Sequence, residues 1–455
     1  MAKRLLRVGK WTLFVLGSAL ALWPLGMGVF AWRAEARLTR TLKELASQGE
    51  PVRLSQLVKP PIPESENAAT LYSKAFSAIR FSDEDAKSAE DILSGKLTAA
   101  DPNVVSRAAA IVERNRTALA LIHQASAMPR CRFPIAWEKG NDVTFPHLPG
   151  LRQCARLVEL ESVTLALADR PDAAVDACGI IFQIGDVADG PSFILELTKY
   201  ACIDIGVQTL EVILRESEPS PTACQALAVR LAREDLMSSF KRSLQGERIS
   251  GISDFERVRS ARDPLKAVIE LEGGHPDRRD RNPTRTESNG PSRDSYFTRW
   301  LFASDEVAYL EAMAQLIGQA PRFYREVQAA LSALEEPQSR LLEPHAMTAL
   351  LLPSFHRSFD QRDRRIATLG LSRVALLLRA YRAERGLYPK SLPELEQVLA
   401  EKLPQDPFSG KPFAYRREGT GFVLYSWGVN LRDDGGTPPP AGHRDEGDIV
   451  FRCLE

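Results

Sequence analysis

Apolar residues recur at helical spacing through most of this 455-residue chain. Between residues 151 and 233, several apolar faces follow one another, and each ends at a short segment that cannot continue a helix. These interruptions are Asp169–Asp172, Gly190–Ser192 and Ser220–Pro221. Because an amphipathic helix buries its apolar face against a neighbour, the pattern predicts a mostly α-helical protein. It leaves open whether the helices form a helical bundle or an irregular helix-pair array.

One segment departs from this pattern because it is apolar on every side. Residues 11–32 carry no charge, and as a helix they are long enough to cross a bilayer core of about 30 Å. Trp11 and Trp32 stand at its ends, where aromatic side chains meet a membrane interface. We therefore expect an uncleaved transmembrane signal anchor that binds the membrane through residues 11–32, with residues 1–10 as a cytoplasmic tail. A cleaved signal peptide and a buried helix of a soluble domain are the alternatives.

Proline and polar composition divide the rest of the chain. Pro60, Pro61 and Pro63 end a charged helical segment. Residues 272–295 hold almost no apolar side chains, so burial cannot offset the cost of ordering them. The predicted divisions are a stalk or linker at 33–63, a helical domain at 64–271, a disordered loop at 272–295, a helical continuation at 296–371 and an α+β module at 372–455.

Charge and motif content argue against several function classes. Lys and Arg together number 59, as do Asp and Glu, so the neutral chain has no general attraction to nucleic acid and we expect no such partner. The six cysteines form no C-x-x-C pair and favour small buried side chains. No phosphate-binding loop, nucleophile elbow or zinc-helix motif occurs. The charged run Gln361–Arg365 indicates a solvated, salt-bridged helix face. We predict no catalytic or cofactor-binding residue from these patterns.

The last part of the chain has a different pattern. An apolar helix around Val374–Tyr381 is followed by two segments whose apolar residues alternate, as they do in strands. These segments are Phe413–Tyr415 and Phe422–Trp427, and the turn-forming residues Glu418–Gly421 lie between them. Ile449–Phe451 is a third strand candidate. The pattern predicts a small α+β module with a short antiparallel sheet.

This module resembles the globular domain of the major pseudopilin of type II secretion systems. The residues that carry the resemblance are Tyr381, Gly386, Tyr388, Pro389, Leu392, Leu395, Leu403, Pro404, Asp406, Pro407, Phe413, Tyr415, Leu424, Tyr425, Ser426, Gly428, Asp448, Ile449 and Val450. The resemblance implies an extracytoplasmic head and, with the predicted anchor, a single-pass location in the bacterial cytoplasmic (inner) membrane. The apolar span lacks the glutamate of pseudopilins, and a long helical region separates it from the head. We therefore do not expect a filament subunit.

The resemblance also implies a metal site. In that family the loop between the last strands holds calcium, and the equivalent stretch here contains Asn430, Asp433, Asp434, Asp445 and Asp448. Oxygen ligands from a loop of this kind suit calcium. The alternative is a solvated acidic loop that binds no ion.

These features together favour a membrane-anchored bacterial envelope protein that is a non-enzymatic interaction or scaffold protein and binds other envelope proteins. One alternative is an accessory component of a type II secretion or pilus-like system, which would co-purify with pseudopilins. The other is an enzyme with an unrecognised site in the helical domain. Such an enzyme would show a concave cluster of buried polar residues among the helices.

Overall fold

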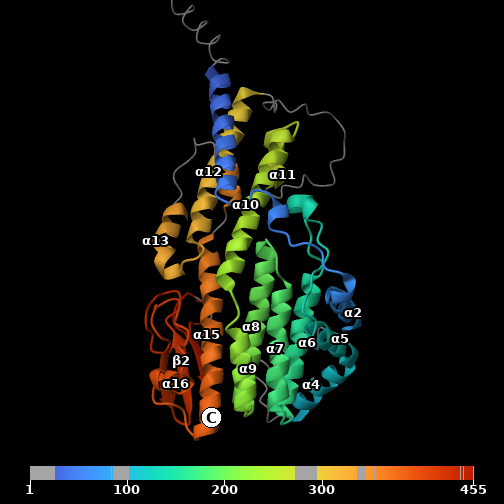
Figure 1. Ribbon diagram of the computed structural model, residues 1–455, viewed down its shortest axis with the longest axis vertical. Helices are drawn as coiled ribbons and strands as arrows, with labels where there is room; N and C mark the ends of the chain where they lie inside the picture. The colour runs from blue at the N-terminus through green and yellow to red at the C-terminus, as the bar shows by residue number, and fades with distance from the viewer. Residues whose placement is uncertain are drawn as a thin grey trace, which may run out of the picture.

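The computed structural model describes residues 26–82, 85, 102–271, 295–335, 345–352, 355–440, 442–443 and 445–453. Within these ranges the chain is mostly helical, and its sheet is three-stranded and lies near the C-terminus. Figure 1 shows an elongated molecule whose long helices run roughly along its long axis. The sheet lies beside one end of the longest helix, α15 (Phe355–Arg385).

The prediction that residues 11–32 span a membrane is corrected by the structure, which has a helix at residues 26–47. This helix begins inside the predicted span, but beyond Trp32 it carries charged residues and packs on the protein. Its Arg37 pairs with Glu311, and its Glu35 accepts two hydrogen bonds of 2.7 Å from Arg299. No helix in the described ranges is both long enough and apolar enough to cross a bilayer. The predicted transmembrane helix and single-pass inner-membrane location are therefore wrong; residues 1–25 lie outside the described residues.

The central helices begin and end where the sequence pattern places the interruptions. They are α6 (Leu148–Leu167), α7 (Pro171–Val187), α8 (Phe193–Glu216) and α9 (Pro221–Leu231). Ser192 and Ser220 cap α8 and α9, accepting hydrogen bonds from the backbone amides of Ile194 and Ala223. Proline at the first position of α7 and α9 leaves no helical hydrogen bond unmade. These short-range signals confirm the predicted helix starts.

The central helices pack as a bundle more than as an open array. Helices α6, α7 and α8 each contact the other two, and α9 contacts both α7 and α15. Figure 1 shows α6, α7 and α8 side by side. Gly206 of α8 permits one close approach, since an added Cβ there would lie 2.6 Å from the Phe182 ring. Cys154, Cys178, Cys202 and Cys224 are buried in this region as free thiols, as their apolar surroundings predict.

A buried carboxylate lies inside this bundle. Glu159 of α6 is fully buried, and its Oε1 has no hydrogen-bond partner among the described residues. Its Oε2 lies 2.9 Å from Nη1 of the half-exposed Arg156. Burial raises the Glu159 pKa to about 7 even though Arg156 acts to lower it. The bundle is thus destabilised by this charge at neutral and alkaline pH.

Replacing Glu159 with Gln is expected to stabilise the protein at pH 8. The unfolded carboxyl titrates near 4.5 and the folded one near 7. Wild-type stability therefore falls as pH rises from about 4.5 to 7, whereas Glu159→Gln escapes the loss. We expect a gain of about 2 kcal/mol at pH 8, which disappears near pH 5. Thermal melts at the two pH values measure it, with the exposed Glu113→Gln as control. An equal gain at both pH values would contradict the assignment.

Smaller helices cover the outer face of the central layer. They are α2 (Ala69–Ala78), α4 (Pro102–Arg114) and α5 (Arg116–Ser126), with 3-10 turns at η1 (Leu54–Gln56), η2 (Glu64–Glu66) and η3 (Trp137–Asp142). Helix α2 packs on α5 and α6, and α4 packs on α6. The proline-rich segment from Val58 to Pro63 has no regular structure and runs between η1 and η2.

A second group of helices extends toward the other end of the molecule. It contains α10 (Leu236–Ser260), α11 (Pro264–Leu271), α12 (Tyr296–Gln319), α13 (Tyr324–Glu335) and α14 (Ala346–Leu351). Helix α12 packs on α10, where the Tyr309 hydroxyl donates to the Glu247 carbonyl at 2.8 Å. Asp305 of α12 accepts hydrogen bonds from the amides of Met347 and Thr348 at the start of α14. The predicted disordered loop lies outside the described residues except for Ser295.

Helix α15 ties the helical region to the sheet, and it corrects one expectation. The run Gln361–Arg365 is not a solvated face, because Arg362 and Asp363 are fully buried. Arg362 donates to the carbonyls of Ala320 and Arg322 in the turn that joins α12 to α13. The pattern of charge along the chain cannot reveal this, because the two carbonyls lie some forty residues away.

The C-terminal module consists of the end of α15, α16 (Leu392–Leu399), β1 (Ala414–Glu418), β2 (Gly421–Ser426) and β3 (Ile449–Cys453). The antiparallel order is β1-β2-β3, and Leu424 lies opposite both Tyr415 and Phe451. Every residue of β2 is buried. Its core is continuous with that of α8, α9 and α15, so the module is packed into the helical region.

Candidate functional site

The five residues predicted to hold calcium lie along the loop between β2 and β3. Asp448 is fully buried and accepts hydrogen bonds from the backbone amides of Gly436 at 2.7 Å and Asp434 at 3.3 Å. Asn430 donates its side-chain amide to Asp434 at 2.7 Å. Asp433 accepts from the Tyr425 hydroxyl, and Asp445 pairs with Arg364.

These partners give each carboxylate a role inside the protein. Asp448 organises the loop through two amides, while Asp445 is held on the side of α15. In the described ranges, no three residues of the types His, Cys, Asp and Glu are grouped so that they could hold a metal ion. The donor set therefore does not fit a preformed calcium cage. Calcium binding stays a prediction.

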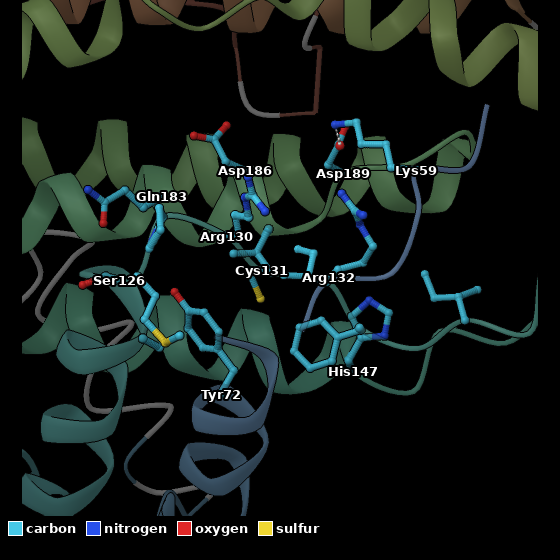
Figure 2. Close-up of a pocket in the computed structure, with 17 residues that line it drawn as sticks. Lys59, Tyr72, Ser126, Arg130, Cys131, Arg132, His147, Gln183, Asp186 and Asp189 are labelled. Atoms are coloured by element: carbon cyan, nitrogen blue, oxygen red, sulfur yellow. Dashed lines mark hydrogen bonds and ion pairs between the residues drawn. The ribbon is translucent and has the colours of Figure 1, made fainter. Parts of the chain in front are cut away.

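A cleft in the helical region is a second candidate site. It has a volume of about 500 Å³ and lies between three chain segments that are distant in sequence. These are the proline-rich segment at 59–62, the end of α5 with the chain that follows it to residue 135, and the end of α7 with Asp189, together with Tyr72 and His147. Figure 2 shows side chains from these segments facing a common space. We call this space the α7 cleft.

One wall of the α7 cleft is aromatic. The Phe133 ring stacks on His147 with centroids 4.3 Å apart and an angle of 10° between the rings, and it stacks on Phe76 at 5.9 Å. Tyr72 of α2 lies beside this wall, and Figure 2 places its hydroxyl on the side of Ser126 and Cys131. The wall can therefore cover an apolar group and offers a hydroxyl at its edge.

The carboxylates of the cleft are already paired. Asp189 accepts from Lys59 and from Arg242, each at 2.5 Å. Asp186 pairs with Lys199 at 3.0 Å and with Arg230. Burial acts to raise the Asp189 pKa, but the interactions with Lys59 and Arg242 hold it below its usual value. Both groups are therefore neutralised anions and not free bases.

Arg132 differs from the other charged groups of the cleft. Its Nη1 donates to the Pro60 carbonyl, and no ion pair joins it to a carboxylate in the described part of the chain. Neighbouring Arg130 pairs with Glu66 at 3.2 Å. Arg132 is therefore a cation whose hydrogen-bond partner is a neutral carbonyl. Figure 2 shows its side chain extending between His147 and Asp189.

Burial moves the pKa values of three groups in the cleft that could act as nucleophiles or bases away from 7. Burial raises the Cys131 pKa to about 12 and lowers the His147 pKa to about 4. Burial also raises the Tyr72 pKa. The thiol and the phenol thus keep their protons, while His147 is a neutral ring stacked on Phe133. The lining can donate and accept hydrogen bonds but presents no thiolate, phenolate or imidazolium.

The sequence patterns did not identify this site. Residues 129–150 show no regular apolar periodicity in the sequence, and this stretch supplies Arg130, Cys131, Arg132, Phe133 and His147. The usable signal was the density of basic, aromatic and thiol side chains in one irregular segment. Nothing in the local pattern could show that residues 59–62 and the end of α7 meet it.

Comparisons with known proteins add no relationship to this picture. No protein-family model matches the chain, and no curated protein or solved structure matches it either.

Proposed function

We propose that this protein is a non-catalytic binding protein and that the α7 cleft holds a small organic ligand. A volume of about 500 Å³ falls within the range of about 300–1,000 Å³ that is typical of small-molecule sites. The aromatic wall and the polar groups at its edge have the mixed character of such sites. The helices form a scaffold that fixes the three segments around the cleft.

The observation that carries this proposal is a concave lining whose carboxylates are already paired with cations. The cleft is a concave polar site among helices, as an enzyme would require, but Cys131 and Tyr72 hold their protons and His147 is stacked and neutral. The carboxylates are bound to two cations each. A site whose carboxylates are paired and whose thiol and phenol keep their protons supports binding over covalent catalysis or catalysis by a carboxylate base.

We also propose that the C-terminal module is related in fold to the pseudopilin globular domain. The order of long helix, short helix and antiparallel strands supports this relationship. Asp406 lies in the turn before the sheet and accepts hydrogen bonds from the amides of Phe408 and Ser409. Because α15 is covered by α8, α9 and α13, we assign the module a structural part in the scaffold and not a role in docking to pseudopilins.

Filling the cleft is expected to abolish binding of small aromatic probes. Ser126 is half-buried and lines the cleft, so Ser126→Trp places an indole in the space. Its neighbour Ala127 is exposed and does not line the cleft, which makes Ala127→Trp a matched control. Saturation-transfer difference NMR with 3-phenylpropionate and 3-phenylpropionamide reports contact with the protein. We expect at least one probe to give a signal with wild type and Ala127→Trp, and none with Ser126→Trp.

Two results would contradict the proposal. One is the absence of signal from both probes with the folded wild-type protein. The other is an unchanged signal in Ser126→Trp, which would place the probes elsewhere on the molecule. Thermal melts of both variants establish that each is folded.

A further inference from the structure

We propose that the ligand of the α7 cleft is an organic anion, with an apolar body against the Phe133–His147 wall and a carboxylate or phosphate against Arg132. This inference rests on the proposed binding function and adds the chemical class of the ligand. It follows from the balance of charge in the lining, the fixed position of Arg132 and the neutral character of the wall.

The charge balance favours an anion. Lys59, Arg130 and Arg132 line the cleft, against the two carboxylates Asp186 and Asp189. Asp189 has a second cation partner in Arg242, while the partners of Asp186, Lys199 and Arg230, also pair with Glu234 and form a neutral group with it. A cationic ligand would therefore have to compete with lysines and arginines already in place. An anionic ligand meets surplus positive charge at a partly enclosed site, where charge-assisted hydrogen bonds are strong.

The backbone of Arg132 is held in place before any ligand binds. Its amide donates to Oδ1 of Asn67 at 2.8 Å, and its carbonyl accepts from Nδ2 of the same side chain at 2.8 Å. The amide of Ala68 donates to the carbonyl of Arg130 at 3.0 Å. The loop is thus tied to the start of α2 on both sides of Cys131. A cation on a fixed backbone loses little freedom on binding, which favours affinity.

The guanidinium still has donors to offer. Arginine carries five N–H donors, and among the described residues the Arg132 guanidinium donates through Nη1 alone, with the Pro60 carbonyl as acceptor. A carboxylate or phosphate could take two of the remaining donors in the planar arrangement that arginine provides. Arg130 is less suited to this role because Glu66 already pairs with it.

The other residues of the cleft lining favour a ligand whose body is uncharged and apolar. Neutral His147 and Phe133 present stacked rings, and Met128, Ile135 and Ile62 add apolar surface. Burying such surface against an aromatic or aliphatic group is favourable because it removes apolar area from water. An inorganic anion would leave this apolar surface uncovered. Tight binding therefore requires a ligand with both an anionic group and an apolar body.

Isothermal titration calorimetry with four probes at pH 7.5 tests this inference on the full chain. The probes are 3-phenylpropionate, 2-phenylethyl phosphate, the uncharged 3-phenylpropionamide and inorganic phosphate. We expect one or both aromatic anions to bind roughly tenfold to hundredfold more tightly than the amide. Which of the two aromatic anions binds more tightly distinguishes a carboxylate ligand from a phosphate ligand. Inorganic phosphate should bind more weakly than the aromatic anions.

Variants at Arg132 test whether the preference for an anion over the amide depends on this side chain. Arg132→Gln should remove the preference for anion over amide, and Arg132→Lys should retain part of it because charge remains without the planar pair of donors. Arg152→Gln is the matched control, since Arg152 is exposed on α6 and does not line the cleft. Thermal melts verify that the variants are folded.

The outcomes separate the two proposals. Equal affinity of wild type for amide and anions would overturn the anion assignment and leave the binding function standing. Retention of the full preference in Arg132→Gln would overturn the role of Arg132. Inorganic phosphate binding as tightly as the aromatic anions would overturn the organic body. Failure of all four probes to bind would overturn the proposed function itself.

Discussion

Replacing Arg362 with Met is expected to destabilise the protein by roughly 3–5 kcal/mol. Arg362 is fully buried, with Nη1 donating to the Ala320 carbonyl at 2.6 Å and Nη2 to the Arg322 carbonyl at 2.7 Å. Its Nε donates to Asp363 at 2.7 Å, and the guanidinium lies 4.9 Å from the centre of the Phe240 ring. Methionine fills similar space but leaves the two carbonyls without this donor and the buried Asp363 carboxylate without its cation, with the Tyr324 amide as its remaining donor.

Urea unfolding followed by circular dichroism measures this loss. Arg364→Met is the matched control on the same helix, since Arg364 pairs with the exposed Asp445 and should contribute under 1 kcal/mol. The double variant Arg362→Met with Asp363→Leu should recover part of the stability, because it removes the stranded carboxylate. A loss in Arg362→Met no larger than in Arg364→Met would show that the turn between α12 and α13 does not depend on this arginine.

Replacing Asp406 with Ala is expected to cost roughly 2–4 kcal/mol and to loosen the C-terminal module. The Asp406 carboxylate is buried and accepts from the amides of Phe408 and Ser409, both at 3.1 Å. It also accepts from the Ser426 hydroxyl at 2.6 Å and from the Trp427 amide at 3.3 Å. One side chain thus joins the turn before β1 to the end of β2.

Asp406→Asn should cost less than Asp406→Ala, because an amide oxygen still accepts part of this set. The exposed Asp445→Ala is the control within the same module. Urea unfolding gives the free energies, and hydrogen exchange of the β2 amides reports the module directly. Rapid exchange in β2 is expected for Asp406→Ala alone; protection equal to wild type would contradict the bridging role.

Local signals in the sequence accounted for much of the fold. Proline at positions 171 and 221 and serine at 192 and 220 act within one helical turn, so the helix starts could be predicted. The alternation around Tyr415 and Leu424 predicted the strands in the same way. These features depend on neighbours a few residues apart.

Features that depend on distant contacts could not be predicted. The run around Arg362 has the charge pattern of a solvated face, yet its partners are carbonyls of another turn. Trp32 closes an uncharged stretch, but the residues after it pack on α12 through Arg37 and Glu35. The α7 cleft likewise forms only when residues 59–62, 125–135 and the end of α7 come together.

The most direct test of the binding proposal uses the methyl group of Met128. Among the methionines that the structure describes, Met128 alone lines the cleft, whereas Met313 and Met347 are buried elsewhere. Protein labelled with [methyl-13C]methionine would be titrated with 3-phenylpropionate and with 2-phenylethyl phosphate, with Met128→Leu assigning the resonance. We expect the Met128 signal to shift in a saturable manner with at least one of them while those of Met313 and Met347 stay fixed. A Met128 resonance that both probes leave unmoved up to their solubility limits would contradict the proposal.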